Sequence, residues 1–299
     1  MGEVVREPLY ENLATIFERV RVNISKRTQA PEFPFGLTLL DKATHGIRRG
    51  KLTLVASRTS EGKTSFSLQM AMRLADSGKV VAFISLEDDR EQIAEKIYCN
   101  LFQEDNYSVM RGVAKKIDDP AVNTLFKTLK LLVIDNFGFT FDEIRHVVEE
   151  LDPKPDVIFL DYIQIIQSNG NRYEAMNEFT ADARRYSVDQ DIAFVITSQI
   201  NRHGARDSRP QLHHLSGSDT LEQCADLILL MYYPYIYKDP TFNYDSVDGV
   251  TVSGYDVAPK NWIEVEVAKN KTGERGIIIP LQFTGRHYAY HDWAGRPES

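Results

Sequence analysis

The chain alternates short runs of apolar residues with longer amphipathic segments. Continuous apolar runs rich in Val, Ile and Leu are typical of parallel strands that are buried on both faces. Such runs predict strands at residues 51–57, 80–87, 131–137, 156–166 and 193–199. Helical spacing of apolar residues predicts helices at 62–77, 140–151 and 174–189. This alternation indicates an α/β fold, with a sheet connected by right-handed crossovers.

Three more strands are expected toward the C-terminus, at residues 227–233, 262–270 and 276–283. No helical pattern separates the last two, so we expect them to pair as antiparallel strands at one edge of the sheet. The predicted fold class is therefore a mostly parallel twisted sheet flanked by helices, with antiparallel strands at the C-terminal edge. Residues 234–261 are rich in Tyr, Asp, Pro and Gly, and they predict a long polar excursion.

The N-terminal segment differs from the rest. Residues 8–27 place Leu, Ile, Phe and Val at helical spacing, which predicts an amphipathic helix. Residues 28–35 contain two prolines and are interpreted as a linker. The expected organisation is an N-terminal helix and linker over 1–35 and one α/β domain over 36–299. The helix is expected either to fold back on its own domain or to dock on a neighbouring subunit.

Composition limits the classes of function. The 299 residues carry a net charge of −8, which excludes a protein coated with basic residues for wrapping duplex DNA. The two cysteines, Cys99 and Cys224, form no CxxC pair, so neither a zinc site nor a disulfide framework is indicated. The N-terminus has no apolar signal-peptide core, and no apolar run approaches the length of a membrane helix. We expect a cytoplasmic or nucleoid-associated protein with no membrane partner.

The clearest motif is SRTSEGKTS, at residues 57–65, between a predicted strand and a predicted helix. Gly62, Lys63 and Thr64 match the end of the phosphate-binding pattern GxxxxGK[ST], while Ser57 replaces its first glycine. Backbone N–H groups of such a loop cradle phosphates, Lys63 would neutralise the β and γ oxygens, and Thr64 would help to hold Mg²⁺. The residues expected to bind ATP are Ser57, Arg58, Thr59, Ser60, Glu61, Gly62, Lys63, Thr64 and Ser65.

A second carboxylate motif lies about 100 residues later, in DVIFLDYIQ. Four apolar residues end at Asp161, which is the form of a Walker B strand. The Asp161 carboxylate is expected to reach the Mg²⁺ ion, directly or through water.

With these motifs in order, the chain resembles the C-terminal ATPase domain of DnaB-type replicative helicases, in the RecA-like P-loop superfamily. The resemblance covers about residues 36–293. Six blocks carry it, in the order of that family: the segment leading into the phosphate loop, VVAFISLE, VIFLDYIQII, FVITSQINR, TLEQCADLILLMY and VAKNKTGERG. Only the phosphate loop is specific when taken alone.

The resemblance implies roles for individual residues. Glu87 matches the general base that polarises the attacking water, and Gln199 matches the sensor of the γ-phosphate. Lys269 and Lys271 match a basic pair that reaches the ATP of the next subunit, and Arg275 is a second candidate for that role. The second position is usually Arg in the DnaB type. Lys-Asn-Lys instead resembles the pair in bacterial RecA recombinases, and Lys lacks the planar fork of Arg.

The resemblance also implies single-stranded DNA as a partner. The expected DNA contacts are Arg202, Arg206 and Arg209, and the small residues Ser216, Gly217 and Ser218. Hydroxyl and backbone N–H groups can bind phosphates, and a few Arg residues suffice once subunits surround a strand.

The function implied is an ATP-dependent helicase that translocates on single-stranded DNA as a ring, expected to be a hexamer, together with other replication proteins. The alternative is a RecA-like ATPase, such as a recombinase or a recombination mediator, that binds DNA without unwinding it. The Lys-Asn-Lys pair favours this alternative, as does the short segment of about 35 residues before the motor. Such a short segment is also expected of a phage or plasmid protein, or of an accessory ATPase. A nucleotide-switched scaffold with little hydrolysis is the third hypothesis, and Glu87 and Asp161 argue against it.

Overall fold

The computed structural model describes residues 11–26, 30–135, 140–166, 170–200, 209–215, 219–237, 246–247, 250–251 and 259–293. The chain divides into two units, Met1–Pro31 and Glu32–Ser299. The first contains α1 (Leu13–Lys26), where an amphipathic helix is predicted. Leu13 and Phe17 of α1 are exposed. Docking of α1 on a neighbouring subunit stays a prediction.

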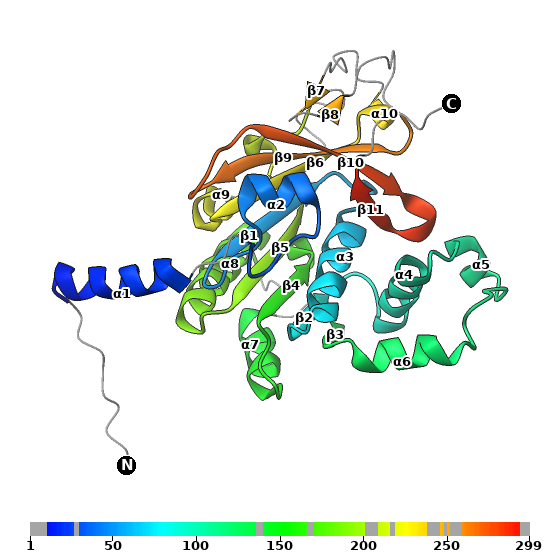
Figure 1. The fold of residues 1–299 in the computed structure, drawn as a ribbon, viewed down its shortest axis with the longest axis horizontal. Coiled ribbons are helices and arrows are strands. Elements are labelled where there is room, and N and C mark those ends of the chain that lie inside the picture. Colours follow the sequence, from blue (N-terminus) through cyan, green and yellow to red (C-terminus); the bar gives the residue numbers. More distant parts are fainter. Residues whose placement is uncertain are drawn as a thin grey trace. The chain divides into compact units, whose positions relative to one another are not determined.

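The second unit is built on one nine-stranded sheet with the order β11-β10-β9-β6-β1-β5-β4-β2-β3 (Figure 1). The strands from β6 to β3 are parallel, and β9, β10 and β11 pair antiparallel. The prediction of a mostly parallel sheet with an antiparallel C-terminal edge is thus confirmed. The strands are β1 (Leu52–Ser57), β2 (Val81–Ser85), β3 (Leu131–Asp135), β4 (Val157–Asp161), β5 (Ala193–Gln199), β6 (Leu227–Tyr232), β9 (Trp262–Asn270), β10 (Ile277–Thr284) and β11 (Ala289–Asp292).

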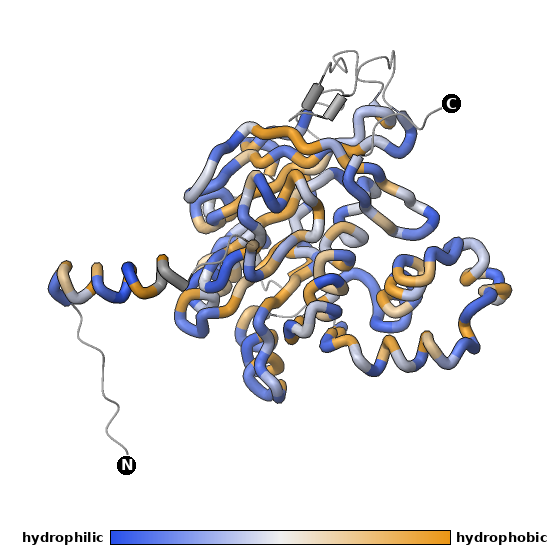
Figure 2. The backbone as a smooth tube through the Cα atoms, viewed as in Figure 1, coloured by the Kyte–Doolittle hydropathy of each residue, from blue (hydrophilic) through white to orange (hydrophobic). Residues whose placement is uncertain are grey.

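Helices cover both faces of this sheet. One hydrophobic cluster joins Val55 of β1 to side chains of the helices α3 and α4, and the other joins Leu54 to those of α7 and α8. Neighbouring residues of β1 therefore belong to opposite clusters, which is why the strand is apolar throughout. Figure 2 shows the hydrophobic positions concentrated on the central strands. The helices are α2 (Thr38–Thr44), α3 (Lys63–Asp76), α4 (Arg90–Phe102), α5 (Asn106–Met110), α6 (Pro120–Thr128), α7 (Phe141–Glu150), α8 (Arg172–Asp189), α9 (Asp219–Cys224) and α10 (Pro234–Tyr237).

Local sequence explains where key helices begin. The Asp89 side chain accepts a hydrogen bond from the Gln92 backbone N–H, and the Gln92 side chain accepts one from the Asp89 backbone N–H. This capping box starts α4. Thr140 and Glu143 form the same arrangement at the start of α7. Gly78, which follows α3, has φ of +90°, as expected for a residue that ends a helix. None of the described helices is long and apolar enough to cross a membrane.

The structure changes the bounds of two predicted segments and describes part of a third. The predicted linker 28–35 contains Phe33 and Phe35, which are fully buried in the second unit, so the boundary falls after Pro31. The strand predicted over 156–166 ends at Asp161, and Ile163–Ile165 forms a 3-10 turn. Of the predicted excursion 234–261, the structure describes α10 and a short pair of strands, β7 (Ser246–Val247) and β8 (Val250–Thr251). The remainder of that excursion, up to residue 258, lies outside the described residues.

Candidate nucleotide-binding site

A cavity of about 380 Å³ lies beyond the carboxyl ends of the central strands. Ligands of open α/β sheets bind at this edge. The phosphate loop between β1 and α3 forms one wall, and residues at or just beyond the ends of β2, β4, β5 and β10, with Lys96 of α4, complete the cavity. The lining residues are Arg58, Thr59, Ser60, Gly62, Lys63, Thr64, Ser65, Glu87, Asp88, Lys96, Tyr162, Gln199, Phe283, Gly285 and Tyr288.

The phosphate loop has one position that requires glycine. Gly62 has φ of +82°, and a Cβ atom there would lie 2.1 Å from the hydroxyl oxygen of Tyr290. That hydroxyl, on β11, donates a hydrogen bond to the Gly62 carbonyl at 2.9 Å. The loop then enters α3 at Lys63, so the free N–H groups of the helix start face the cavity.

Two of the predicted nucleotide-binding residues do not line the cavity. Ser57 is buried at the end of β1, and its hydroxyl donates to the Arg58 carbonyl. The Glu61 side chain is 1% exposed and accepts the Arg58 N–H at 3.0 Å. Burial raises the pKa of Glu61 above its ordinary value. Both side chains hold the loop in shape, and only the backbone at these positions remains a candidate for phosphate contact.

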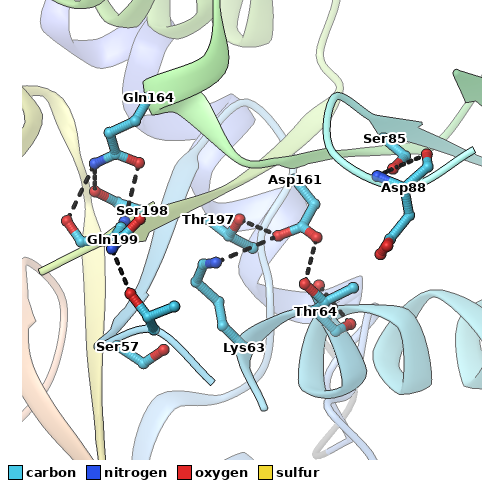
Figure 3. A network of polar contacts seen from close by, with 12 residues as sticks. Ser57, Lys63, Thr64, Ser85, Asp88, Asp161, Gln164, Thr197, Ser198 and Gln199 are labelled. Atoms are coloured by element: carbon cyan, nitrogen blue, oxygen red, sulfur yellow. Dashed lines mark hydrogen bonds and ion pairs between the residues drawn. The ribbon is translucent and has the colours of Figure 1, made fainter. Parts of the chain in front are cut away.

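The centre of the site is a buried polar cluster (Figure 3). Asp161, at the end of β4, is fully buried and accepts a hydrogen bond from the Thr64 hydroxyl at 2.6 Å. Its other oxygen accepts one from Thr197 and lies 3.8 Å from the Lys63 ammonium nitrogen. Lys63 also lies 4.4 Å from the ring centroid of Tyr162.

This donor set fits a magnesium ion. The Asp161 carboxylate and the Thr64 hydroxyl are hard oxygen ligands that already touch each other. Within the described residues, no group of three or more His, Cys, Asp or Glu could hold a metal. Mg²⁺ needs no such cage, because it keeps several waters and shares substrate phosphates.

Glu87 lies two residues beyond the end of β2 and lines the cavity. Partial burial raises its pKa. Lys63 lowers it, and the negative charges of Asp161 and Asp88 raise it further. A carboxylate with a raised pKa, beside the lysine that is predicted to bind phosphate, is suited to accept a proton.

Gln199 ends β5 beside the phosphate loop. Its side-chain amide donates to the Thr59 hydroxyl, and its backbone N–H donates to the side-chain oxygen Oε1 of Gln164 at 3.0 Å. The Gln164 amide in turn donates to the Ser198 hydroxyl at 2.8 Å (Figure 3). Gln199 therefore connects the phosphate loop to the 3-10 turn that follows β4.

The predicted basic cluster lies far from this cavity. Lys269 pairs with Ile228 at the amino end of β6, and the Lys271 N–H donates to the carbonyl of Asp226. Asp226 is joined to Leu52, the first residue of β1. Five residues of strand separate that point from the phosphate loop, or about 17 Å. Lys269, Lys271 and the exposed Arg275 thus cannot serve the site of their own chain.

Most of the predicted DNA contacts lie outside the described residues, namely Arg202, Arg206, Ser216, Gly217 and Ser218. Arg209 is described, and its guanidinium forms an ion pair with Glu264, which is 1% exposed. The second guanidinium nitrogen of Arg209 donates to the other carboxylate oxygen of Glu264 at 3.3 Å. The Arg209 charge is paired inside the domain, which favours a structural role, and a DNA contact by Arg209 stays a prediction.

Several residues of the cavity, and of the contacts behind its walls, were not predicted. Thr197 could have been found, since it lies two positions before Gln199 and shares its side of the strand. Asp88 and Lys96, which form an ion pair, follow β2 in the chain. Phe283, Gly285, Tyr288 and Tyr290 come from the end of the chain, where no motif marks them.

Comparison with known proteins gives a consistent result. The family model for the DnaB-like helicase C terminal domain matches residues 33–292. A probable plasmid replicative DNA helicase of Chlamydia psittaci is 29% identical over 253 residues, which are 80% of this chain and 51% of that protein. The replicative DNA helicase DnaC of Bacillus subtilis is 26% identical over 285 residues, 90% of this chain and 59% of the relative. The chain spans about half to three-fifths of the length of these curated relatives.

Solved structures share the fold. One solved ATPase domain superimposes with a TM-score of 0.78 at 22% identity, covering 94% of this chain and 99% of that one. A DnaB-like replicative helicase, from a structure describing its interactions with primase, gives a TM-score of 0.76 at 23% identity. The match covers 96% of this chain and 68% of that one.

The sheet and the phosphate loop define a P-loop nucleotide-binding domain of the RecA-like class. Since the family model covers most of the chain, the protein belongs to the DnaB-like helicase C-terminal domain family.

Proposed function

We propose that this chain is the ATP-hydrolysing motor of a DnaB-type replicative helicase, acting on single-stranded DNA. The observation that carries the proposal is the grouping of Lys63, Thr64, Asp161 and Glu87 around one cavity in a chain of this family. Replicative helicases among the relatives favour unwinding over a recombinase role. The same relatives support action during DNA replication in the cytoplasm, with other replication proteins as partners.

Each residue has a task in hydrolysis. Lys63 and the backbone N–H groups at the start of α3 would hold the phosphates of ATP. Thr64 and Asp161 would hold Mg²⁺, which when bound neutralises charge on the β and γ oxygens. Glu87 would take a proton from the attacking water, and Gln199 would report the presence of the γ-phosphate to the segment after β5.

The active form is proposed to be a ring of identical subunits, expected to be a hexamer. Lys269, Lys271 and Arg275 lie at the opposite end of the sheet from their own phosphate loop. In a ring whose subunits meet front to back, these residues would complete the site of the neighbour, as an arginine finger does.

Hydrolysis gives the first test. The rate of ATP hydrolysis should rise when single-stranded DNA is added, and Lys63→Ala should abolish it, because the charge facing the β- and γ-phosphates is lost. Fluorescent ATP binding should weaken in the same variant. Normal turnover of Lys63→Ala would remove the phosphate loop from the mechanism.

A further inference from the structure

The two lysines at the end of β9 are held by another element of their own chain. The Lys269 ammonium donates to the carbonyl oxygen of Glu222 and lies 3.5 Å from that of Gln223. The Lys271 ammonium lies 3.4 Å from the same Gln223 oxygen. Both acceptors belong to the last turn of α9, where carbonyl groups lack helical partners and the helix dipole is negative. Figure 1 shows α9 beside this end of β9.

Asp226 joins this contact to the start of the central strand. One carboxylate oxygen lies 3.4 Å from the Lys271 ammonium and 4.0 Å from that of Lys51. The other accepts the Leu52 backbone N–H at 3.2 Å and lies 3.3 Å from the Arg184 Nε. Among the described residues, Asp226 is the carboxylate within ion-pair distance of Lys271, and its side chain is only 12% exposed.

Lys269 and Lys271 carry like charges at the turn of the β9–β10 hairpin. Burial, and then the charge of Lys271, lowers the pKa of Lys269, while the charges of Glu222 and Asp226 raise it. Asp226 therefore offsets part of this repulsion and holds Lys271 by an ion pair. A single negative charge shared among several cations restricts where each can lie.

The helix α9 is anchored in the domain. Leu221 of the helix is buried, and so is Ala225, which follows its last residue. The Glu222 and Gln223 carbonyl oxygens therefore hold a fixed position beside the two ammonium groups.

We propose that Asp226 is a positioning residue for the trans-acting lysines, acting through its ion pair with Lys271 beside the α9 carbonyl groups that hold both ammonium groups. This inference rests on the proposed function, in which Lys269 and Lys271 complete the ATP site of the next subunit. Asp226 touches no nucleotide itself, because it lies at the opposite end of the sheet from the cavity of its own chain.

Mixed assemblies isolate this role. Lys271→Ala subunits keep a working phosphate loop but supply no Lys271, and Lys63→Ala subunits supply Lys271 but cannot hydrolyse ATP. Their mixture should recover DNA-stimulated hydrolysis. Adding Asp226→Asn to the Lys63→Ala chain should lower the recovered kcat about tenfold or more, since misplacement of a catalytic group has effects of this size. KM for ATP should stay unchanged, because the working cavities are unaltered.

Asp156→Asn on the Lys63→Ala chain is the matched control. Asp156 likewise accepts a backbone N–H at this end of the sheet and pairs with an arginine, Arg49, but it touches neither lysine. It should leave the recovery intact. Asp226→Glu, which keeps the charge, should restore most of the recovery and serves as the test if Asp226→Asn does not fold.

The outcomes are distinct. Equal recovery of hydrolysis with and without Asp226→Asn overturns the positioning role. A loss of recovery in the Asp156→Asn control as large as in Asp226→Asn also overturns it. So does an Asp226→Glu variant that recovers no more hydrolysis than Asp226→Asn. If the original pair of variants co-assembles and recovers nothing, trans completion itself is wrong, and the role of Asp226 falls with it.

Discussion

Three consecutive acids follow β2, and the structure gives each a different environment. Glu87 lines the cavity beside Lys63. The Asp88 backbone contacts the Ser85 hydroxyl, and its carboxylate pairs with Lys96. Asp89 caps α4. The sequence alone left open whether this run was a solvated acidic surface. The three environments favour the interpretation in which only Glu87 is placed to activate water.

Replacement of Glu87 separates chemistry from binding. Glu87→Gln keeps the size of the side chain but removes the proton acceptor. It should lower kcat by roughly 10²–10⁴ and leave ATP affinity within a few-fold of wild type. Single-turnover hydrolysis and nucleotide titration measure the two effects. Asp89→Asn, which retains a capping side chain, is the control. Similar small effects in both variants would show that Glu87 is not the base.

The acid limb of the pH profile should belong to Glu87. A general base acts only when deprotonated, so hydrolysis should fall as pH drops through its pKa. Because partial burial raises that pKa, the fall should begin at a higher pH than for an ordinary glutamate. Asp88 is a like charge that raises the pKa further, and Asp88→Asn should move the limb to lower pH. An unmoved limb in Asp88→Asn would assign it to another group.

At the scale of elements, the phosphate loop depends on a strand from the far end of the chain. Tyr290 of β11 is fully buried, stacks on Phe283 and donates to the Gly62 carbonyl. Gln69 of α3 also accepts the Tyr290 N–H at 2.7 Å. The antiparallel edge of the sheet thus supports the loop from behind.

Loss of one hydroxyl tests that support. Tyr290→Phe should lower the free energy of unfolding by about 1 kcal/mol, the net value of a typical hydrogen bond. It should also raise KM for ATP a few-fold, because the Gly62 carbonyl is released. Tyr186→Phe, in the cluster on the other face of the sheet, is the control for a lost hydroxyl. A change in stability with no change in KM would limit Tyr290 to packing.

The sequence predicted these elements unevenly, for physical reasons. Strands of the parallel sheet were found because burial on both faces leaves continuous apolar runs. Phe33 and Phe35 were assigned to a linker because prolines flank them, although both are fully buried. The strand at Asp161 was drawn too long, since the apolar residues after it form a turn instead. The contact of Tyr290 with Gly62 joins positions 228 residues apart, and no local pattern encodes it.

At the scale of the whole molecule, the sequence could not assign the arginines near the expected DNA channel. Arg209 pairs with Glu264, whose oxygen also accepts the indole N–H of Trp262 at 3.0 Å. In sequence, an arginine in a segment with Gly, Ser and Pro is equally compatible with a DNA contact and with such an ion pair. The pairing depends on β9, which places Glu264 beside Arg209, and the sequence alone does not show this.

The salt dependence of DNA binding distinguishes these arginines. We expect Arg202→Ala with Arg206→Ala to weaken single-strand binding and to reduce the log–log salt slope by about 1.4, from two contacts at about 0.7 each. Arg209→Ala should leave the slope unchanged and instead lower the free energy of unfolding by roughly 3 kcal/mol, because Glu264 stays buried without its partner. Fluorescence anisotropy across a salt series and thermal denaturation measure both. A flatter salt slope in Arg209→Ala would show that Arg209 contacts DNA.

Strand displacement on a forked duplex tests the central claim most directly, that the cavity drives a motor on single-stranded DNA. With ATP, the assembled wild-type chain should separate the fork. It should not do so without nucleotide, nor as Lys63→Ala or Glu87→Gln, although Glu87→Gln should still bind the DNA in the presence of ATP. An assembled chain that hydrolyses ATP on single-stranded DNA and yet separates no duplex would contradict the account and favour a DNA-binding ATPase that does not unwind.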